Sequence, residues 1–321
     1  MPLSLADCLA TLLFHNLTAG PILQPMNGHP INRREFVTAS TALIAAAAVP
    51  NRSSQLMIQS QTIGDVIDMI RKSIPLDVSK GTVDTIKCGD PQQPLTGIVT
   101  TMFATVEVIR ATAQMNANLI IAHEPTFYNH NDEKEWLSGH PVLEMKLDLL
   151  NRNKIVIWRF HDHWHAHRPD GVLMGVLTRL GWEKYYDWAE PLMVKLPGPT
   201  LAEIIRLSKE RLGIAQVRYI GDLSLTCKRV AVLPGAWGGR RHIETLHRLK
   251  PDLLICGELQ EWETSEYVRD LRALGLNSAL LVLGHSVSEE PGMEWLVTWL
   301  EPKVPGVKIA HIPSGNPFSF A

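Results

Sequence analysis

The stretch from Gly97 to Glu124 reads GIVTTMFATVEVIRATAQMNANLIIAHE and contains the pattern that decides the fold. Its first part, residues 97–103, is rich in residue types that favour β-strands. Residues 105–115 place apolar side chains at helical spacing behind Thr105, a residue type that caps helix N-termini. The apolar run that follows, up to His123, is typical of a strand covered on both faces. The order strand, helix, strand predicts a βαβ unit in a parallel or mixed sheet.

The same alternation of helices and strands continues toward the C-terminus. Apolar residues at helical spacing and short apolar runs follow one another, separated by glycine and proline turns. Pro197-Gly198-Pro199 is the clearest internal linker. The pattern predicts an α/β fold, with helices over residues 62–71, 141–151, 171–180, 200–212, 242–249, 262–274 and 291–300 and strands over residues 154–161, 229–235, 253–257 and 278–285.

The composition is that of an ordinary globular protein, with 45% hydrophobic and 20% charged residues among 321. The net charge of -2 argues against nucleic acid or an anionic membrane surface as a partner. The four cysteines, Cys8, Cys88, Cys227 and Cys256, include no CxxC pair, so they predict neither a disulfide framework nor a thiolate zinc site. The thirteen histidines are the unusual feature, since seven of them fall between His123 and His167.

The first 50 residues resemble an export signal. The segment Asn32-Arg33-Arg34-Glu35-Phe36-Val37-Thr38 is similar to a twin-arginine motif, and an alanine-rich apolar stretch follows it. Met26 would place the arginines close behind the initiator, so it is our candidate for the true start. The apolar stretch is too short to span a membrane, so we expect export to the periplasm and no membrane span after signal removal. If the arginines merely precede an ordinary helix, the protein stays in the cytoplasm.

Three groups of residues lie at the ends of predicted strands and have side chains of the types that bind metals, namely imidazoles and carboxylates. The first is the pair His123-Glu124, which closes the apolar run quoted above. In open α/β sheets, ligands bind beyond the carboxyl ends of the strands. A polar pair that caps a helix before Pro125 is the alternative interpretation.

The second group alternates histidine with other residues, at His161, His163, His165 and His167. In an extended segment, alternate side chains all point to one face. Imidazoles side by side on a surface have little structural purpose and would repel one another when protonated, so a bound metal explains them best. Not all of them need to bind, because one can orient a ligand or relay protons.

The third group is His285 and Glu289, at the end of the predicted strand 278–285. If Ser286 opens a helix, the two side chains lie on one face of it. The alternative is an acidic residue in the first turn that interacts with the helix dipole, a role that Glu290 would fill equally well. Taken together, the three groups predict a polynuclear metal centre.

These residues resemble the Nif-three-like dinuclear metal-centre proteins, often labelled type 2 GTP cyclohydrolase I homologues. The resemblance covers residues 62–321, and its most specific motif runs from Gly284-His285 to Gly292. The other motifs are Ala122–Pro125, His161–Val172, Val230–Gly235, Cys256–Glu258 and Ser314–Phe318. The resemblance implies a Nif-three-like α/β fold of two interlinked lobes with mixed sheets, assembled as a homo-hexamer. The implied lobes are a metal-binding lobe over residues 60–196, a second lobe over 197–275 and a return segment over 276–321 that completes the first.

Two positions depart from the pattern of that family. The family usually has a second histidine where this chain has Glu124, and an aspartate where it has His165. The exchange of one imidazole and one carboxylate leaves three imidazoles and two carboxylates in the predicted ligand set, which are the usual totals of the family. This favours a metal site that is retained in this chain. The ligand set that the resemblance implies is His123, Glu124, His165, His285 and Glu289, holding two divalent metal ions. Mixed nitrogen and oxygen ligands suit zinc, iron or manganese.

Two functions follow from the resemblance. The first is a metal-dependent hydrolase in which Glu289 bridges the metals and His161 or His163 moves a proton. Its small-molecule substrate is not identified, and a phosphoester, a nucleotide and a cyclic amide are the candidates. The second is a non-catalytic metal-binding oligomeric assembly or regulatory interaction protein. A metallo-β-lactamase-like enzyme is disfavoured, because its Asp-His pair is absent and the order of the elements differs.

Overall fold

The computed structural model describes residues 61–320 of the chain. The predicted export signal, with Arg33, Arg34 and the candidate start Met26, lies outside the described residues. Among the described helices, none combines the length and the apolar character that a membrane crossing requires.

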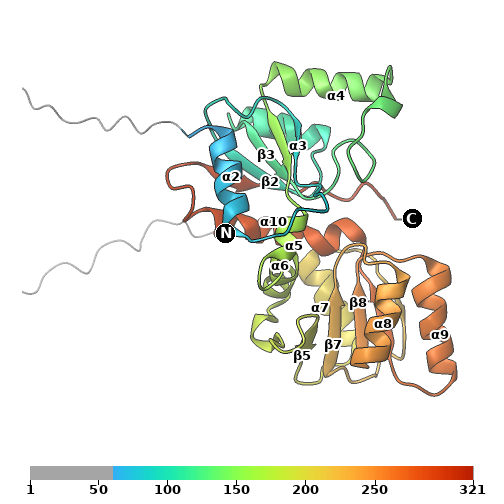
Figure 1. Ribbon diagram of the computed structural model, residues 1–321. Coiled ribbons are helices and arrows are strands. Elements are labelled where there is room, and N and C mark those ends of the chain that lie inside the picture. Colours follow the sequence, from blue (N-terminus) through green and yellow to red (C-terminus); the bar gives the residue numbers. More distant parts are fainter. Residues whose placement is uncertain (1–60, 321) are drawn as a thin grey trace, which may run out of the picture. The chain divides into compact units, whose positions relative to one another are not determined.

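The first of two sheets contains the strands quoted at the outset (Figure 1). Its strand order is β1-β4-β3-β2-β10, in which β10, β2, β3 and β4 are parallel and β1 is an antiparallel edge strand. The strands are β1 (Ile86–Cys88), β2 (Ile98–Thr101), β3 (Leu119–Ala122), β4 (Val156–Arg159) and β10 (Ile309–His311). The predicted βαβ unit is confirmed as β2, α3 (Val106–Gln114) and β3, with Thr105 capping the helix through its side chain.

Helices cover both faces of this sheet because its buried strands are apolar on both faces. Ile98, Leu119 and Val156 pack against one pair of helices, α2 (Ile63–Ser73) and α10 (His285–Leu300). The side chains of the same strands that point to the opposite face pack against α3 and α4 (Pro141–Arg152). This three-layer arrangement confirms the predicted α/β fold class with mixed sheets.

The second sheet repeats the same plan. Its strand order is β5-β7-β8-β9-β6, with three parallel strands in the middle and antiparallel strands at both edges. The strands are β5 (Met193–Lys195), β6 (Arg218–Ile220), β7 (Arg229–Leu233), β8 (Leu253–Cys256) and β9 (Ala279–Val282). One face packs on α6 (Gly171–Leu180) and α7 (Leu201–Leu212), and the other on α8 (Gly239–Leu249) and α9 (Glu266–Ala273).

Several boundaries differ from the predicted ones. The edge strands β1, β5, β6 and β10 were not predicted, because three residues are too few to show an alternating pattern. Helix α10 begins at His285 rather than at Pro291, which lies inside the helix. A π-helical turn, Glu261–Ser265, precedes α9, and short 3-10 helices occupy Glu135–Leu137 and Glu183–Tyr185. The implied lobe boundaries stay a prediction. Strand β5 lies in the range given to the first lobe and β9 in the return segment, whereas both strands belong to the second sheet.

Helix α10 joins the two sheets, because it follows β9 of the second sheet and packs on the first. It crosses α6 at two glycines that leave no room for a side chain. A Cβ atom on Gly292 would lie 2.6 Å from Cα of Val172, and one on Gly175 would overlap the carbonyl oxygen of Pro291. This close crossing fixes the first turn of α10, where His285 and Glu289 lie.

The variant Gly175→Ala is therefore expected to lower the free energy of unfolding by about 1–3 kcal/mol, because overpacking a tight helix crossing forces the backbones apart. Urea unfolding followed by circular dichroism measures the change. Gly64→Ala in α2 is the matched control, since its added methyl group would meet the nearest atom at an ordinary 3.4 Å. Equal stabilities of the two variants would contradict a tight crossing.

Candidate metal centre

Six side chains converge where the two sheets are linked. They come from the carboxyl end of β3, the segment after β4 and the first turn of α10: His123, Glu124, His161, His165, His285 and Glu289. Strands β3 and β4 are parallel neighbours, so the residues that follow them lie at the same edge of the sheet. All five metal ligands predicted from the sequence are in this cluster, which His161 joins.

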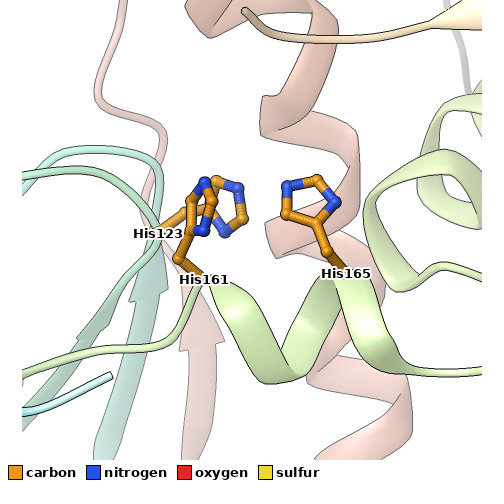
Figure 2. Close-up of side chains that lie close together, drawn as sticks. All are labelled: His123, His161 and His165. Carbon is orange, nitrogen blue, oxygen red and sulfur yellow. The ribbon is translucent and has the colours of Figure 1, made fainter. Parts of the chain in front are cut away.

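The segment that carries two of these histidines is a helix and not an extended chain. Helix α5 runs over Asp162–Ala166, so the prediction that four alternating histidines face one side is wrong. The Asp84 carboxylate accepts hydrogen bonds from the backbone N–H groups of His161 (2.7 Å), Asp162 (2.9 Å) and His163 (2.8 Å) and so holds the N-terminus of this helix. Residues four apart share a helix face, which brings His161 and His165 together (Figure 2).

The other two histidines of this segment lie outside the cluster. His163 is buried, and its Nδ1 lies 2.6 Å from the Asp84 carboxylate. The ring of His167 packs against three tryptophans, Trp164, Trp295 and Trp299, with its Nδ1 2.6 Å from the carbonyl oxygen of Pro169. Neither belongs to a group of described side chains whose ligand atoms are close enough to hold a metal.

Each of the four histidines in the cluster uses Nδ1 to bind an oxygen acceptor and leaves Nε2 for the centre. The distances from Nδ1 are 3.1 Å to Phe160 O for His123, 2.9 Å to Asp162 for His161, 2.8 Å to Asp170 for His165 and 3.2 Å to Glu258 for His285. An acceptor at one ring nitrogen fixes the tautomer and presents the lone pair of the other, as in histidines that bind metals.

The four Nε2 atoms face the two central carboxylates. From Glu289, the distances are 3.8 Å to His123, 3.9 Å to His165 and 3.1 Å to His285. From Glu124, they are 3.7 Å to His161 and 3.4 Å to His285. Two sets of ligand atoms lie within 4.8 Å of one another and can hold a metal, namely His123, His161 and His165, and His123, Glu124 and Glu289.

The environment of His123 shows that the cluster fits a cation. Its Nε2 is buried and has no hydrogen-bond partner, which is costly unless another group binds it. Burial, and then the charges of His161 and His165, lower the pKa of His123 well below its usual value. The ring is therefore neutral, with a lone pair directed into the cluster, as a metal ligand requires.

The carboxylates make positive charge favourable at two other positions. Burial by itself would lower the pKa of His165, but the charge of Asp170, with its hydrogen bond, raises it to about 9. The pKa of His285 rises to about 10 because its hydrogen bonds to Glu124 and Glu289 outweigh burial. The same carboxylates would stabilise a metal cation in place of these protons.

We therefore expect zinc uptake at pH 7 to release about two protons per chain, from His165 and His285, because ligands must lose their protons to bind. The affinity should rise with pH up to about 10, the higher of the two pKa values, which is that of His285. In the metal-free protein both histidines have a folded-state pKa above the ordinary 6.5. Their contribution to stability is thus present below that value and is lost as the pH rises through about 9 and about 10. Calorimetric titration in buffers of different ionisation enthalpy counts the protons, and a pH-independent affinity would contradict the expectation.

Glu124 is held by a buried arginine at the end of β4. Arg159 is completely buried, and its Nη2 lies 3.1 Å from Oε2 of Glu124, while its Nε donates to the carbonyl oxygen of His123. Burial would raise the pKa of Glu124, but the hydrogen bond with His285 and the charges of His161 and Arg159 lower it overall. Glu124 is therefore ionised, with Oε1 facing the cluster.

Glu289 is held in place by a glycine turn after β7. Gly235 has φ +75°, a left-handed conformation that favours glycine, and a Cβ atom there would overlap the Glu289 carboxylate. The N–H of Gly235 donates to Ser288 Oγ at 2.9 Å, which ties this turn to the first turn of α10. The segments that follow β7 and β9 of the second sheet thus supply a wall of the site and two side chains of the cluster, His285 and Glu289.

The acidic residues that orient the histidines were not among the predicted site residues. Asp162 and Asp170 follow His161 and His165 by one and five residues, so an acidic residue close after a histidine was an available signal. Glu258 belongs to the motif Cys256–Glu258, which carries part of the family resemblance. Nothing local marks Asp84, which lies 79 residues before the histidine it binds.

The chain is similar to known proteins over nearly all of its described length. Residues 61–317 match the model of the family described as Duf34/NIF3 (NGG1p interacting factor 3). A Clostridium perfringens protein named GTP cyclohydrolase 1 type 2 homolog is 27% identical over 240 residues, which are 71% of this chain and 87% of that protein. A hypothetical protein of Staphylococcus aureus has a similar fold, with a TM-score of 0.65 at 18% identity over 81% of this chain and 99% of the other. A Bacillus cereus protein related to NIF3 gives a TM-score of 0.62 at 15% identity, over 82% and 100%.

Proposed function

This chain belongs to the Duf34/NIF3 family, and on that premise we propose that it binds two divalent metal ions and acts as a metal-dependent hydrolase. The observation that carries the proposal is the convergence of four imidazole Nε2 atoms on two carboxylates, with His123 Nε2 buried and without a hydrogen-bond partner. The proposed ligands are His123, Glu124, His165, His285 and Glu289. Zinc, iron and manganese suit such a mixture of ligands.

The residues of the cluster have different proposed roles in metal binding and proton transfer. Glu289 presents one carboxylate oxygen toward His165 and the other toward His123 and His285, so it is the proposed bridging ligand. The oxygen acceptors at Nδ1 hold the four imidazole rings in orientation before a metal arrives, which lowers the cost of binding. Divalent ions bound here would supply Lewis acidity and a water of lowered pKa. Of the histidines predicted to move protons, His163 is held by Asp84, whereas the His161 side chain is 23% exposed and lies in the cluster.

The hydrolase proposal is tested with the metal-loaded protein and a panel of phosphoesters, nucleotides and cyclic amides. We expect turnover of at least one class, abolished in Glu289→Gln and retained in Glu301→Gln, a substitution of an exposed glutamate at the end of the same helix. Metal binding without turnover of any class would contradict the hydrolase and favour the second candidate, a non-catalytic metal-binding assembly.

Four exposed apolar side chains favour assembly, whichever activity holds. Val142 and Met145 of α4, Tyr128 of the loop before it and Trp136 of the 3-10 helix Glu135–Leu137 are large apolar side chains that are more than half exposed. Aromatic side chains and methionine are enriched where proteins contact one another. We propose a homo-hexamer, and light scattering on the eluting protein gives the mass that tests it.

We also propose export through the paired arginines, and replacing Arg33 and Arg34 with lysine should keep the protein out of the periplasm.

A further inference from the structure

We infer that His161 is a metal ligand and that the centre has two chemically different halves, an imidazole half that zinc occupies first and a carboxylate half that suits manganese. The imidazole half consists of His123, His161 and His165, and the carboxylate half of Glu124 and His285, with Glu289 facing both halves. This inference rests on the proposed function, because it needs metal ions in the same cluster. It adds a ligand to the five predicted from the sequence and assigns a class of metal to each half.

The geometry of His161 is that of a ligand. Its Nδ1 lies 2.9 Å from Asp162, whose other carboxylate oxygen accepts hydrogen bonds from Thr82 Oγ1 (2.8 Å) and the N–H of Val83 (3.1 Å). Asp162 is thus anchored from a segment 80 residues away and holds the imidazole in one orientation. The ring therefore has one nitrogen committed to Asp162 and the other directed into the cluster, which is the arrangement of histidines that bind metals.

The imidazole half is set by three stacked or edge-on rings. The centroid of His123 lies 4.6 Å from that of His161 and 5.1 Å from that of His165, and the latter two are 4.8 Å apart (Figure 2). One ring nitrogen of each histidine lies within 4.8 Å of those of the other two, which is close enough for all three to bind one ion. Three histidines are a ligand set that zinc takes in catalytic sites.

The carboxylate half is set by the buried arginine. Because Arg159 binds Oε2 of Glu124 at 3.1 Å, only Oε1 remains for a metal, and it lies 3.4 Å from Nε2 of His285. Glu289 Oε2 lies 3.1 Å from the same nitrogen. Two carboxylates with one imidazole suit harder ions such as manganese, whereas an imidazole set favours zinc.

The test is a competition between metals. Metal-free protein is given one equivalent of zinc per chain and is then dialysed against an excess of manganese, and both metals are counted by elemental mass spectrometry, with the electron paramagnetic resonance of manganese as a second readout. We expect about one zinc and one manganese per chain in the natural protein. His161→Ala should lose zinc, with an apparent zinc affinity at least about 100-fold lower, and keep manganese. Glu124→Gln should keep zinc and lose manganese.

The controls separate this inference from the proposed function. His140→Ala replaces an exposed histidine whose side chain makes no capping bond, and it should keep both metals. His161→Gln, which keeps a polar side chain, serves if the alanine variant does not fold, as judged by circular dichroism. If the natural protein binds two ions and His161→Ala binds both with unchanged affinity, His161 is not a ligand and the proposed function stands. If the natural protein binds none, both proposals fall.

Discussion

Glu289→Gln is expected to lower the metal content of the purified protein from about two ions per chain to fewer than one. The carboxylate of Glu289 lies 3.1 Å from His285, 3.8 Å from His123 and 3.9 Å from His165, so it is the one side chain that faces three of the four histidines. Glutamine keeps the shape of the side chain but lacks the charge and offers a single oxygen, so neither metal position keeps its full ligand set. Elemental mass spectrometry after dialysis against a weak chelator gives the ratio of metal to protein.

The matched control for this variant is Glu301→Gln, which removes an exposed charge at the other end of α10. It should contain as much metal as the natural protein. The expectation would be contradicted by a Glu289→Gln protein that keeps two tightly bound ions. In that case the carboxylate is held by Gly235 and the histidines for a structural reason, and the metal ions lie elsewhere.

Glu124→His is expected to destabilise the metal-free protein by about 2–3 kcal/mol, because it removes the carboxylate partner of a buried charge. Arg159 is completely buried, and it keeps only carbonyl acceptors and the more distant Asp132, at 3.8 Å, when Glu124 is lost. A histidine at position 124 retains a nitrogen that can bind a metal, so the variant removes the partner of Arg159 without removing a possible ligand.

Urea unfolding in the presence of a chelator measures this loss without a contribution from metal binding. Glu124→Gln is the milder variant, because the amide oxygen still accepts a hydrogen bond from Arg159, and we expect it to lose less than half as much. The double variant Glu124→His/Arg159→Met should recover part of the loss, since it removes the unpaired charge. Additive losses in the double variant would show that the two residues are not coupled.

The position of the metal centre was predictable from local patterns because of a general property of parallel sheets. His123 and Glu124 follow an apolar strand, and His285 follows another, so both were placed at carboxyl ends of strands. The spacing of His285 and Glu289 was likewise enough to put both on one face of a helix once the helix began before Pro291. These predictions depend only on periodicity, which is a property of neighbouring residues.

Which of the four alternating histidines face the cluster was not predictable from the periodicity of neighbouring residues. Five residues are too few to form a helix by themselves, because the first turn fixes several residues for one hydrogen bond. Helix α5 exists because the Asp84 carboxylate, far away in the sequence, accepts its first N–H groups. That contact turns His161 and His165 into the cluster and His163 away from it.

The sequence by itself therefore determined the α/β order of the elements and the positions of His123, Glu124, His285 and Glu289 at the ends of strands, because apolar periodicity and strand ends are properties of neighbouring residues. The tertiary structure alone decided which histidines converge, which acids orient them and which arginine holds Glu124. The physical reason is that a hydrogen bond or an ion pair depends on distance in space, and the partners here are brought together by the crossing of α6 and α10 and by the linked sheets. No pattern of neighbouring residues encodes such a contact.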